Sequence, residues 1–560
     1  MGQIYSKAFL VMVWLGPFDA PAAVAAASIQ DFGKRYRAIN KNLRFIGDAS
    51  FWKDMGRESF SDLEALCLVH FFNRIWFERI WVLQEVILAT QIRVLCGTTA
   101  IEWDDIVTMS IYLYESGHAT AWHELRAASL NNPFVRTLAV APMQMDNLRK
   151  GCRDGVMISE DLVLKLEGLD SHGLENAFCQ FLGSMIMVGR IYQCGRPEDK
   201  VLAPLALALH KFSGFMESTL MVPDYTKTLE QVYTEAATLI IDKTSELLLL
   251  TTVEDPAFRA HPSIPSWVPD FSVQHSNPLN FSKFKPDLDV FHGQHTACSV
   301  SISGSQLITR GFWIDTVIQA GPRHDDTSSR DTFQTSPTPF LEFALSLGKQ
   351  YRTGEDAIQA FIRTFVADQI AHHEGLLQFF GAYVRYHCVA SKDFEDILEE
   401  TSRITGLQSP GDLFTALLEH PESLPSWQVL DAFEGRGDST TPTFRYLVAW
   451  SKAIADGSDH NEDNRLIDVA RHLVAECHVG AISFRQMFKG RSGYIGLMPQ
   501  SAQVGDELWL LPGCKTPCTL RPTKKEGVYQ FIGEAYVHGV MHGEFWEDQP
   551  HPDSMLIILE

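Results

Sequence analysis

The residues with the clearest chemical potential in this sequence are two polar residues inside an apolar run. In the stretch IWVLQEVILA, the only polar side chains are those of Gln84 and Glu85. Burying a carboxylate in such surroundings is unfavourable unless it is paired, and otherwise its pKa rises. Carboxylates of this kind serve as general acid–base or electrophile-stabilising groups. Glu85 is therefore a candidate catalytic residue. The alternative is a structural ion pair between Glu85 and Arg79 or Arg74.

Two segments of the sequence contain histidines that are candidate metal ligands. AHHEGLL contains His372, His373 and Glu374, but neighbouring residues of a helix point about 100° apart, whereas a helical zinc site uses positions i and i+4. YVHGVMHGEF has this spacing at His538 and His542, but the glycines that follow each histidine disfavour a helix. We therefore expect no metal site. The sequence also lacks a Gly-x-Ser-x-Gly elbow, a phosphate-binding Walker loop and a Gly-x-Gly-x-x-Gly turn.

Charge, hydropathy and cysteine usage restrict the class of protein. The chain has 560 residues and a formal net charge of −22, which disfavours binding to nucleic acid or anionic membranes. No apolar run reaches the roughly 18 residues that a transmembrane helix requires. The 10 cysteines include no Cys-x-x-Cys pair; Cys514 and Cys518 are four apart in GCKTPC, without a second pair at metal-binding spacing. We interpret them as reduced thiols and expect a cytoplasmic protein.

The segments around Glu85 have the order of an α/β domain. AFLVMVWL is interpreted as a buried β-strand. SFSDLEALCLVHFF is predicted to be a helix with a capping box of Ser61 and Glu64 and an apolar stripe, whose members would be Leu63, Leu66 and Val69 or His70. A second helix over about 77–89 would carry Glu85, and IRVLCG would be a short strand. Strand, helices and strand at this spacing predict an α/β fold.

The remainder of the chain changes from helical to β-rich. We predict four regions: an α/β domain over 1–106, a helical region with short strands over 107–323, a variable and mostly helical region over 324–480, and a small β-rich module over 481–560. Short segments such as YIGLMP, DELWLLPG and VYQFIGEAYVHG, separated by turn residues, indicate a small barrel or meander in the last region.

One block of this sequence resembles a known family signature. RIWFERIWVLQEVILATQIRVLCGTTAIEWDDI is similar to the signature of the fungal heterokaryon incompatibility (HET) domain, and the matching residues are Arg74, Trp76, Phe77, Arg79, Trp81, Gln84, Glu85, Cys96, Gly97 and Trp103. GRPEDKVLAPLALA and GYIGLMPQSAQVGDELWLLPG resemble segments of long HET-domain proteins of the heterokaryon incompatibility protein 6 type, although Glu198 replaces their usual Arg.

The N-terminal segment MGQIYSKAFLVMVWLGP allows three interpretations. Met1-Gly2-x-x-x-Ser6 fits a myristoylation signal, and Lys7 followed by an apolar run resembles a signal peptide. HET proteins, however, carry a similar segment internally, after an aromatic-Ala-Leu-Ser-Tyr-x-Trp-Gly strand and an Asp-x-x-Cys-Ile-x-Gln segment. From the resemblance we expect Met1 to correspond to an internal methionine and the HET domain to lack its N-terminal half.

The resemblance also implies a function. HET domains act in fungal self/nonself recognition and trigger growth arrest or programmed cell death when an incompatible partner is met. The implied partners are a protein from an incompatible strain or an upstream receptor, with a homo-oligomer as a further option, and neither nucleic acid nor membrane is expected. An inactive truncated remnant is the alternative without a function.

An enzymatic alternative follows from a more distant resemblance. The HET domain resembles the TIR domain, in which a Trp precedes a Glu by four residues, as Trp81 precedes Glu85. In TIR domains that cleave NAD, this Glu helps to break the nicotinamide–ribose bond. Glu85 would then be catalytic and NAD the substrate of the intact domain, with no bound cofactor. For this chain we expect no NAD cleavage, because the missing strand and loop would form much of the pocket.

Overall fold

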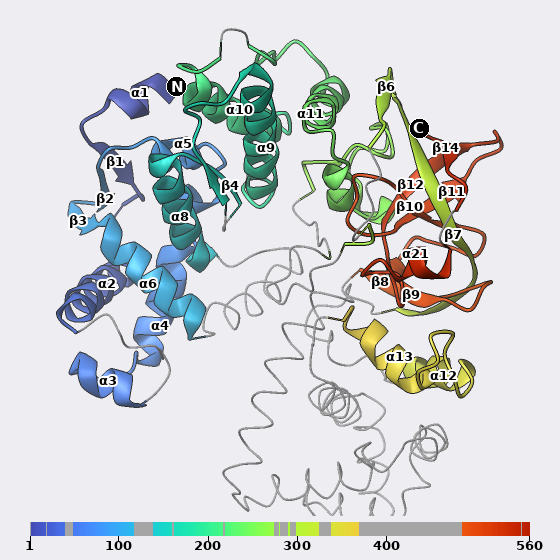
Figure 1. Cartoon of the computed structure of the whole chain (residues 1–560). Coiled ribbons are helices and arrows are strands. Elements are labelled where there is room, and N and C mark those ends of the chain that lie inside the picture. The colour runs from blue at the N-terminus through green and yellow to red at the C-terminus, as the bar shows by residue number, and fades with distance from the viewer. Residues whose placement is uncertain are drawn as a thin grey trace, which may run out of the picture. The chain divides into compact units, whose positions relative to one another are not determined.

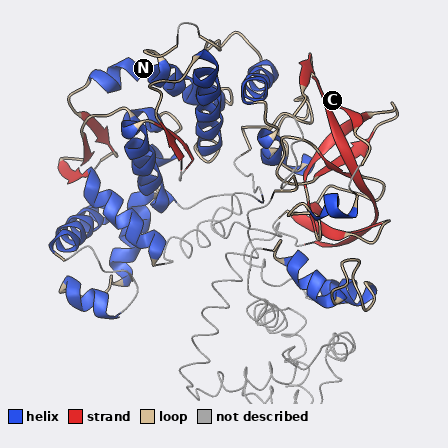
Figure 2. Ribbon diagram, in the orientation of Figure 1, coloured by secondary structure: helices blue, strands red, loops and turns tan. Residues whose placement is uncertain are grey.

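The structure is a computed structural model. It describes residues 2–17, 19–39, 49–116, 138–159, 162–216, 219–273, 279, 289–291, 298–323, 338–368, 484–549 and 552–560. The chain divides into two compact units. Unit 1 consists of Met1–Thr244 and Asp270–His275, and unit 2 consists of Ser245–Pro269 and Ser276–Glu560. The described part of unit 1 is mainly helical, whereas strands predominate in unit 2 (Figures 1 and 2).

The sheet of unit 1 has three strands in the order β1-β2-β3. β1 (Val11–Trp14) runs parallel to β2 (Ile92–Cys96), and β2 pairs antiparallel with β3 (Thr99–Glu102). Parallel strands joined through helices are the α/β arrangement that the sequence predicts. Among the described residues β1 pairs with β2 alone, and its Met12 and Trp14 side chains are 61% and 63% exposed. Of the strand interpreted as buried, Val11 and Val13 are therefore buried, whereas the face that carries Met12 and Trp14 is uncovered.

Ten α-helices of unit 1 fall within the described residues, and two short 3-10 helices accompany them. They are α1 (Gly2–Lys7), α2 (Ala20–Ala38), α3 (Ala49–Met55), α4 (Asp62–Phe72), η1 (Ile75–Glu78), α5 (Val82–Ile87), α6 (Trp103–Glu115), η2 (Leu138–Val140), α8 (Ala141–Asp154), α9 (Ser171–Gly189), α10 (Asp199–Phe212) and α11 (Leu229–Thr244). A hairpin of β4 (Val156–Ser159) and β5 (Leu162–Leu164) lies between α8 and α9 in the chain. α2 packs against α4 and α6.

The start of α4 confirms the predicted capping box, but its buried face differs from the prediction. The Ser61 hydroxyl accepts from the Glu64 amide, and the Glu64 carboxylate accepts from the Ser61 amide. Leu63 and Leu66 are 63% and 68% exposed. The buried side chains of α4 are instead Cys67, Leu68, Phe71 and Phe72. The predicted stripe is wrong because the helix turns these later residues toward the core.

The predicted helix over 77–89 is two elements. The 3-10 helix η1 ends at Glu78, Arg79 has extended backbone angles, and α5 begins at Val82. The reason is tertiary: the Ile80 amide donates to the carbonyl of Gln193, in an isolated parallel bridge between Arg79 and Gln193. A continuous helix would place this amide in an i to i−4 bond and leave the bridge unmade.

The strands of unit 2 form a closed barrel that continues into a second sheet. The ring runs β10-β11-β12-β14-β7 and closes through a β7–β10 pairing. The long strand β7 (Gln306–Arg323) then continues the sheet to β8, β9 and β13, and β6 pairs with it at one end. Figure 1 shows β7 running the length of this β-rich unit.

The bounds of the remaining elements of unit 2 are as follows. They are η3 (Leu248–Thr252), η4 (Pro256–Phe258), β6 (Ser301–Ser303), α12 (Thr338–Ser346), α13 (Ala357–Phe365), β8 (Arg485–Gly490), β9 (Ile495–Pro499), β10 (Glu507–Leu510), β11 (Cys518–Pro522), β12 (Val528–Glu534), β13 (Tyr536–Val537), α21 (Glu544–Asp548) and β14 (Met555–Leu559).

The β-rich C-terminal module is confirmed in character, and its barrel includes a strand from further upstream. β7 lies in the predicted region 107–323 but pairs with β8, β10 and β14 of the predicted module 481–560. The described part of the predicted helical region 324–480 contains α12 and α13. The rest of that region, including His372 and His373, lies outside the described residues.

Candidate functional site

Glu85 is held by three elements that come together around its carboxylate. It lies on α5 and is half-buried. Its Oε2 accepts a hydrogen bond of 3.0 Å from the indole Nε1 of Trp76 on η1, and its Oε1 accepts a longer one of 3.4 Å from the hydroxyl of Tyr5 on α1. Burial, and after it the Glu85 charge, raises the pKa of Tyr5. The carboxylate is thus oriented by two neutral donors.

The alternative interpretation of Glu85, a structural ion pair with Arg79 or Arg74, does not hold among the described residues. Arg74 instead pairs with Asp19, with 2.9 Å between Nη2 and Oδ2, and its Nη1 donates to the carbonyls of Leu15 and Pro17. Arg79 forms no ion pair with Glu85 within the described part of the chain. The physical reason is that Arg79 lies on the extended turn between η1 and α5, where its backbone bridges to Gln193. Arg74 secures the loop that follows β1.

Trp81 and Gln84 attach α5 to a helix far along the chain. The Trp81 Nε1 donates to Asp199 Oδ2 at 3.2 Å, and the Gln84 Nε2 donates to the carbonyl of Ala203 at 3.0 Å. Both acceptors lie on α10. Gln84 is 1% exposed, and its Oε1 has no hydrogen-bond partner among the described residues. These two motif residues therefore have a structural role, on a different side of α5 from the contacts of Glu85.

The start of α10, which accepts the hydrogen bond from Trp81, makes several further hydrogen bonds. Asp199 Oδ1 accepts from the Tyr225 hydroxyl at 2.8 Å. The neighbouring Lys200 is 3% exposed, and its ammonium group donates to the carbonyls of Gly189, Arg190 and Tyr192 at the end of α9. Burial lowers the pKa of Lys200 to about 8. The cation compensates the carbonyl groups that a helix leaves free at its C-terminus.

The other motif residues belong to the core and to a turn. Trp76 packs against Phe77 and Trp103, and Phe77 is fully buried. Cys96 is fully buried, and burial raises the pKa of its thiol, which argues against a nucleophile. Gly97 has φ +56° in the two-residue turn between β2 and β3, a conformation that favours glycine. Among the motif residues, Glu85 therefore supplies a carboxylate that forms no ion pair with any residue the structure describes.

The arrangement around Glu85 can accept hydrogen bonds and stabilise positive charge. Its two oxygens have further lone pairs beyond the bonds from Trp76 and Tyr5. A fixed, half-buried carboxylate interacts more strongly with a developing cation than a fully solvated one. No nucleophile or second carboxylate accompanies it in the contacts of Tyr5, Trp76 and α5 that the structure describes.

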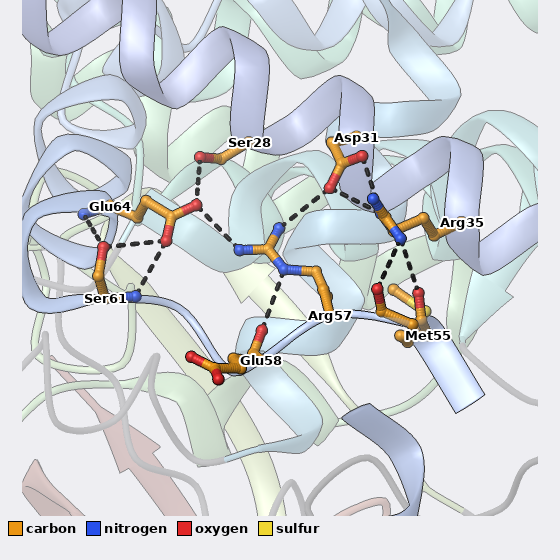
Figure 3. A network of polar contacts seen from close by, with 9 residues as sticks. Ser28, Asp31, Arg35, Met55, Arg57, Glu58, Ser61 and Glu64 are labelled. Atoms are coloured by element: carbon orange, nitrogen blue, oxygen red, sulfur yellow. Dashed lines mark hydrogen bonds and ion pairs between the residues drawn. The ribbon is translucent and has the colours of Figure 1, made fainter. Parts of the chain in front are cut away.

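A polar pocket that sequence reasoning missed lies between α2 and the start of α4. It has a volume of about 540 Å³ and is lined by Ala27, Ser28, Asp31, Arg57, Glu58, Ser59, Ser61 and Glu64. Figure 3 shows Arg57 between Asp31 and Glu64. Arg57 Nη2 lies 2.9 Å from Glu64 Oε1, and Nη1 lies 3.4 Å from Asp31 Oδ2. The capping box was the only local signal for this network, since Arg57 and Asp31 meet only in the folded chain.

The charges in this pocket compensate one another. Burial would raise the pKa of Glu64, but hydrogen bonds from the Ser61 amide, Arg57, the Ser61 hydroxyl and Ser28 outweigh it and lower the pKa to about 2. Arg57 also lies over the ring of Phe60, 4.5 Å from its centroid. The polar groups bind one another, and so the network joins α2 to α4 rather than presenting unpaired groups to a ligand.

Among the described residues, no group of three or more His, Cys, Asp or Glu side chains could hold a metal ion. His538 instead lies between Glu355, 2.7 Å from its Nε2, and Tyr536, 3.0 Å from its Nδ1. No helix in the described ranges is long and apolar enough to cross a bilayer.

Comparison with known proteins gives matches in both units. Residues 1–85 match the family model of the heterokaryon incompatibility protein (HET), and residues 448–557 match that of the Het-6 beta-barrel domain. Over 624 aligned residues the chain is 21% identical to heterokaryon incompatibility protein 6, OR allele, of Neurospora crassa, and the alignment covers 100% of this chain and 80% of that protein. No solved structure matches the chain.

Proposed function

We propose that this chain, which matches the HET family model over residues 1–85 and the Het-6 beta-barrel domain model over residues 448–557, acts in fungal vegetative incompatibility as a self/nonself recognition protein. In this role the chain responds to a protein partner, either one contributed by an incompatible strain or an upstream receptor, and triggers growth arrest or programmed cell death. The site of action is the cytoplasm.

One observation carries this proposal: the similarity to the incompatibility protein extends over the whole chain. It includes the segment that carries β1 and Glu85 in unit 1, which matches the HET model, and the C-terminal strands of the barrel in unit 2, which match the Het-6 beta-barrel model over residues 448–557. A chance likeness of one module would not be expected to include both.

Regulated expression in a filamentous fungus tests the proposal. The full chain is expressed in one strain, which is fused with a panel of strains of different genotype and with itself. Uptake of a vital dye by the fusion cells and the growth of the fused colony are measured. We expect death or arrest in some non-self fusions and normal growth in self fusions. Normal growth in every pairing, with the protein present at normal abundance, would contradict the proposal.

A second candidate function, proposed for the intact domain, is cleavage of NAD with Glu85 as the catalytic residue. The observation in its favour is that Glu85 is oriented by neutral donors rather than neutralised by Arg74 or Arg79. Such a carboxylate can hold ribose hydroxyls and stabilise an oxocarbenium-like centre.

A matched pair of variants separates the two candidates. Glu85→Gln keeps the side-chain shape, and its amide oxygen can still accept from Trp76. Glu102→Gln is the control, because Glu102 lies on β3, also in unit 1, and its side chain is exposed. Release of nicotinamide from NAD that Glu85→Gln abolishes and Glu102→Gln preserves would support the enzyme. An incompatibility response that survives Glu85→Gln would instead support a signalling protein without catalysis.

A further inference from the structure

Two cysteines of the barrel lie in contact in a tight turn. Cys514 lies in the turn between β10 and β11, and Cys518 is the first residue of β11. Their Sγ atoms are 3.8 Å apart, and the Cys518 thiol donates to the Cys514 sulfur. Both side chains are buried, at 3% and 1% exposure. A disulfide requires an Sγ–Sγ distance of roughly 2 Å, so a closure of about 1.8 Å separates this contact from a bond.

The turn is anchored at its start and between the two thiols. At its start the Leu247 amide donates to the Gly513 carbonyl at 3.0 Å, and the Cys514 thiol donates to the Leu247 carbonyl at 3.5 Å. Between the two cysteines, the Thr516 hydroxyl donates to Glu534 at 3.1 Å. The fold therefore already brings the two thiols together, and the entropy of closing the ring is small compared with an unfolded chain.

Gly513 shows how closely this turn is packed. Its φ of +95° favours glycine, and a Cβ there would lie 2.9 Å from both the Leu247 amide nitrogen and the Cys298 Sγ. Cys298 is thus a third thiol beside the same turn, and it is half-buried. No three of the described His, Cys, Asp and Glu side chains are arranged to hold a metal ion, so these thiols do not form such a site.

We propose that Cys514 and Cys518 are a reversible modification site: a dithiol that a hydroperoxide converts to an intramolecular disulfide. The Cys514 sulfur attacks the peroxide, the O–O bond breaks, and the products are a sulfenic acid and an alcohol or water. The Cys518 sulfur then attacks the Cys514 sulfur, the S–S bond forms, the S–O bond breaks, and the oxygen leaves as water with the Cys518 proton. Two electrons pass from the thiols to the peroxide.

The surroundings of the two thiols make their oxidation slow but specific for this pair. The contact with Cys518 and burial both raise the pKa of Cys514, so little thiolate is present at neutral pH. Oxidation therefore requires transient opening of the turn. Once Cys514 is a sulfenic acid, the thiol of Cys518 is already in contact with it. Attack by Cys518 on the sulfenic acid is therefore favoured over its further oxidation by peroxide.

Peptide mapping of the oxidised full chain tests the proposal. The reduced protein is treated under native conditions with hydrogen peroxide, its free thiols are alkylated, and it is digested with trypsin without reductant. Trypsin cleaves after Lys515, between the two cysteines. The cysteines are therefore in separate peptides unless a disulfide joins them. We expect most of the two peptides to appear as one linked species that separates on addition of a thiol reductant.

Two variants and one condition complete the test. Cys518→Ser should abolish the linked species, whereas Cys194→Ser, which removes another half-buried thiol, should preserve it. Denaturing the protein before oxidation should scramble the pairing. A native protein whose Cys514 remains alkylatable after oxidation would overturn the proposal, as would a bond from Cys514 to Cys298 or to any other cysteine.

Discussion

The indole Nε1 of Trp81 donates a 3.2 Å hydrogen bond to the carboxylate of Asp199, and this bond joins two sequence blocks that are 118 residues apart. Asp199 also accepts from Tyr225, so its two oxygens connect α5 with the segment that precedes α11. The HET-like motif therefore acts in part as an attachment between helices of unit 1. The polar residues of this motif need not all be catalytic, since Trp81 and Gln84 donate hydrogen bonds to α10.

Removing the Trp81 donor should destabilise unit 1 modestly. Trp81→Phe keeps an aromatic ring but leaves Asp199 with one donor fewer, which we expect to lower the free energy of unfolding by about 1 kcal/mol. Denaturant unfolding followed by far-UV circular dichroism measures the change. Trp14→Phe is the control, because Trp14 is 63% exposed and should change stability little. Equal effects of the two substitutions would show that the bond to Asp199 contributes nothing.

The two arginines of the motif should differ in importance. Arg74→Gln removes an ion pair with Asp19 and hydrogen bonds to two carbonyls, and we expect a loss of about 2–3 kcal/mol. Arg79→Gln should cost less than about 1 kcal/mol, because the Arg79 side chain forms no ion pair with Glu85. Thermal unfolding of the two variants compares them. A larger loss for Arg79→Gln would restore the counter-charge interpretation of Glu85.

The low pKa of Glu64 predicts an acid-sensitive contribution to stability. The folded pKa is about 2 and the ordinary value is 4.5, so the unfolded chain binds this proton more readily. The stabilisation is complete above pH 4.5 and is lost as the pH falls toward 2. Because the side chain is partly exposed and screened by solvent, we expect about 1–2 kcal/mol. Urea unfolding between these pH values measures it.

Substitutions in the same pocket test this assignment. Glu64→Gln should flatten the pH dependence of unfolding in the acid range, whereas Glu58→Gln should leave it unchanged, because Glu58 bonds Arg57 through its backbone carbonyl alone. A profile that is the same in wild type and Glu64→Gln would disprove the contribution of Glu64.

The buried ion pair of unit 2 should tolerate loss of one partner poorly. Arg485 and Glu534 lie 2.9 Å apart and are both buried, and burial raises the pKa of Glu534 despite the nearby guanidinium. Arg485→Met leaves a buried carboxylate without its cation and should cost about 3–5 kcal/mol. Adding Glu534→Gln should recover part of this loss, since it removes the charge, keeps a carbonyl oxygen that can accept from the Leu279 amide, and offers an NH2 group that can donate to the Thr516 hydroxyl. Strictly additive losses in the double variant would contradict the coupling.

Much of the local structure could be predicted from the sequence. The capping box of Ser61 and Glu64 begins α4 as expected, and the strand predicted at IRVLCG is β2. The short strands near the C-terminus are likewise present, from β8 to β13. Each of these depends on residues that are close together in the chain, so periodicity and turn chemistry suffice to find them.

The face of α4 and the break before α5 could not be predicted in the same way. Leu63 and Leu66 are apolar but exposed, because the packing of α4 against α2 selects Cys67, Leu68, Phe71 and Phe72 for the core. The helix predicted over 77–89 is interrupted because the backbone at Ile80 bonds to Gln193. In both cases a distant segment competed with the local preference and prevailed.

By itself, the sequence determined the α/β order of the N-terminal region, the β-rich end of the chain, the family resemblance and the choice of Glu85 as the residue of interest. Only the tertiary structure decided that Glu85 bonds Trp76 and Tyr5 rather than an arginine, that Trp81 reaches Asp199, and that β7 closes a barrel with β10 and β14. The physical reason is that a buried polar group must be satisfied by whichever partner the packed chain brings within hydrogen-bond distance. A local sequence pattern identifies the polar group, and long-range packing selects its partner.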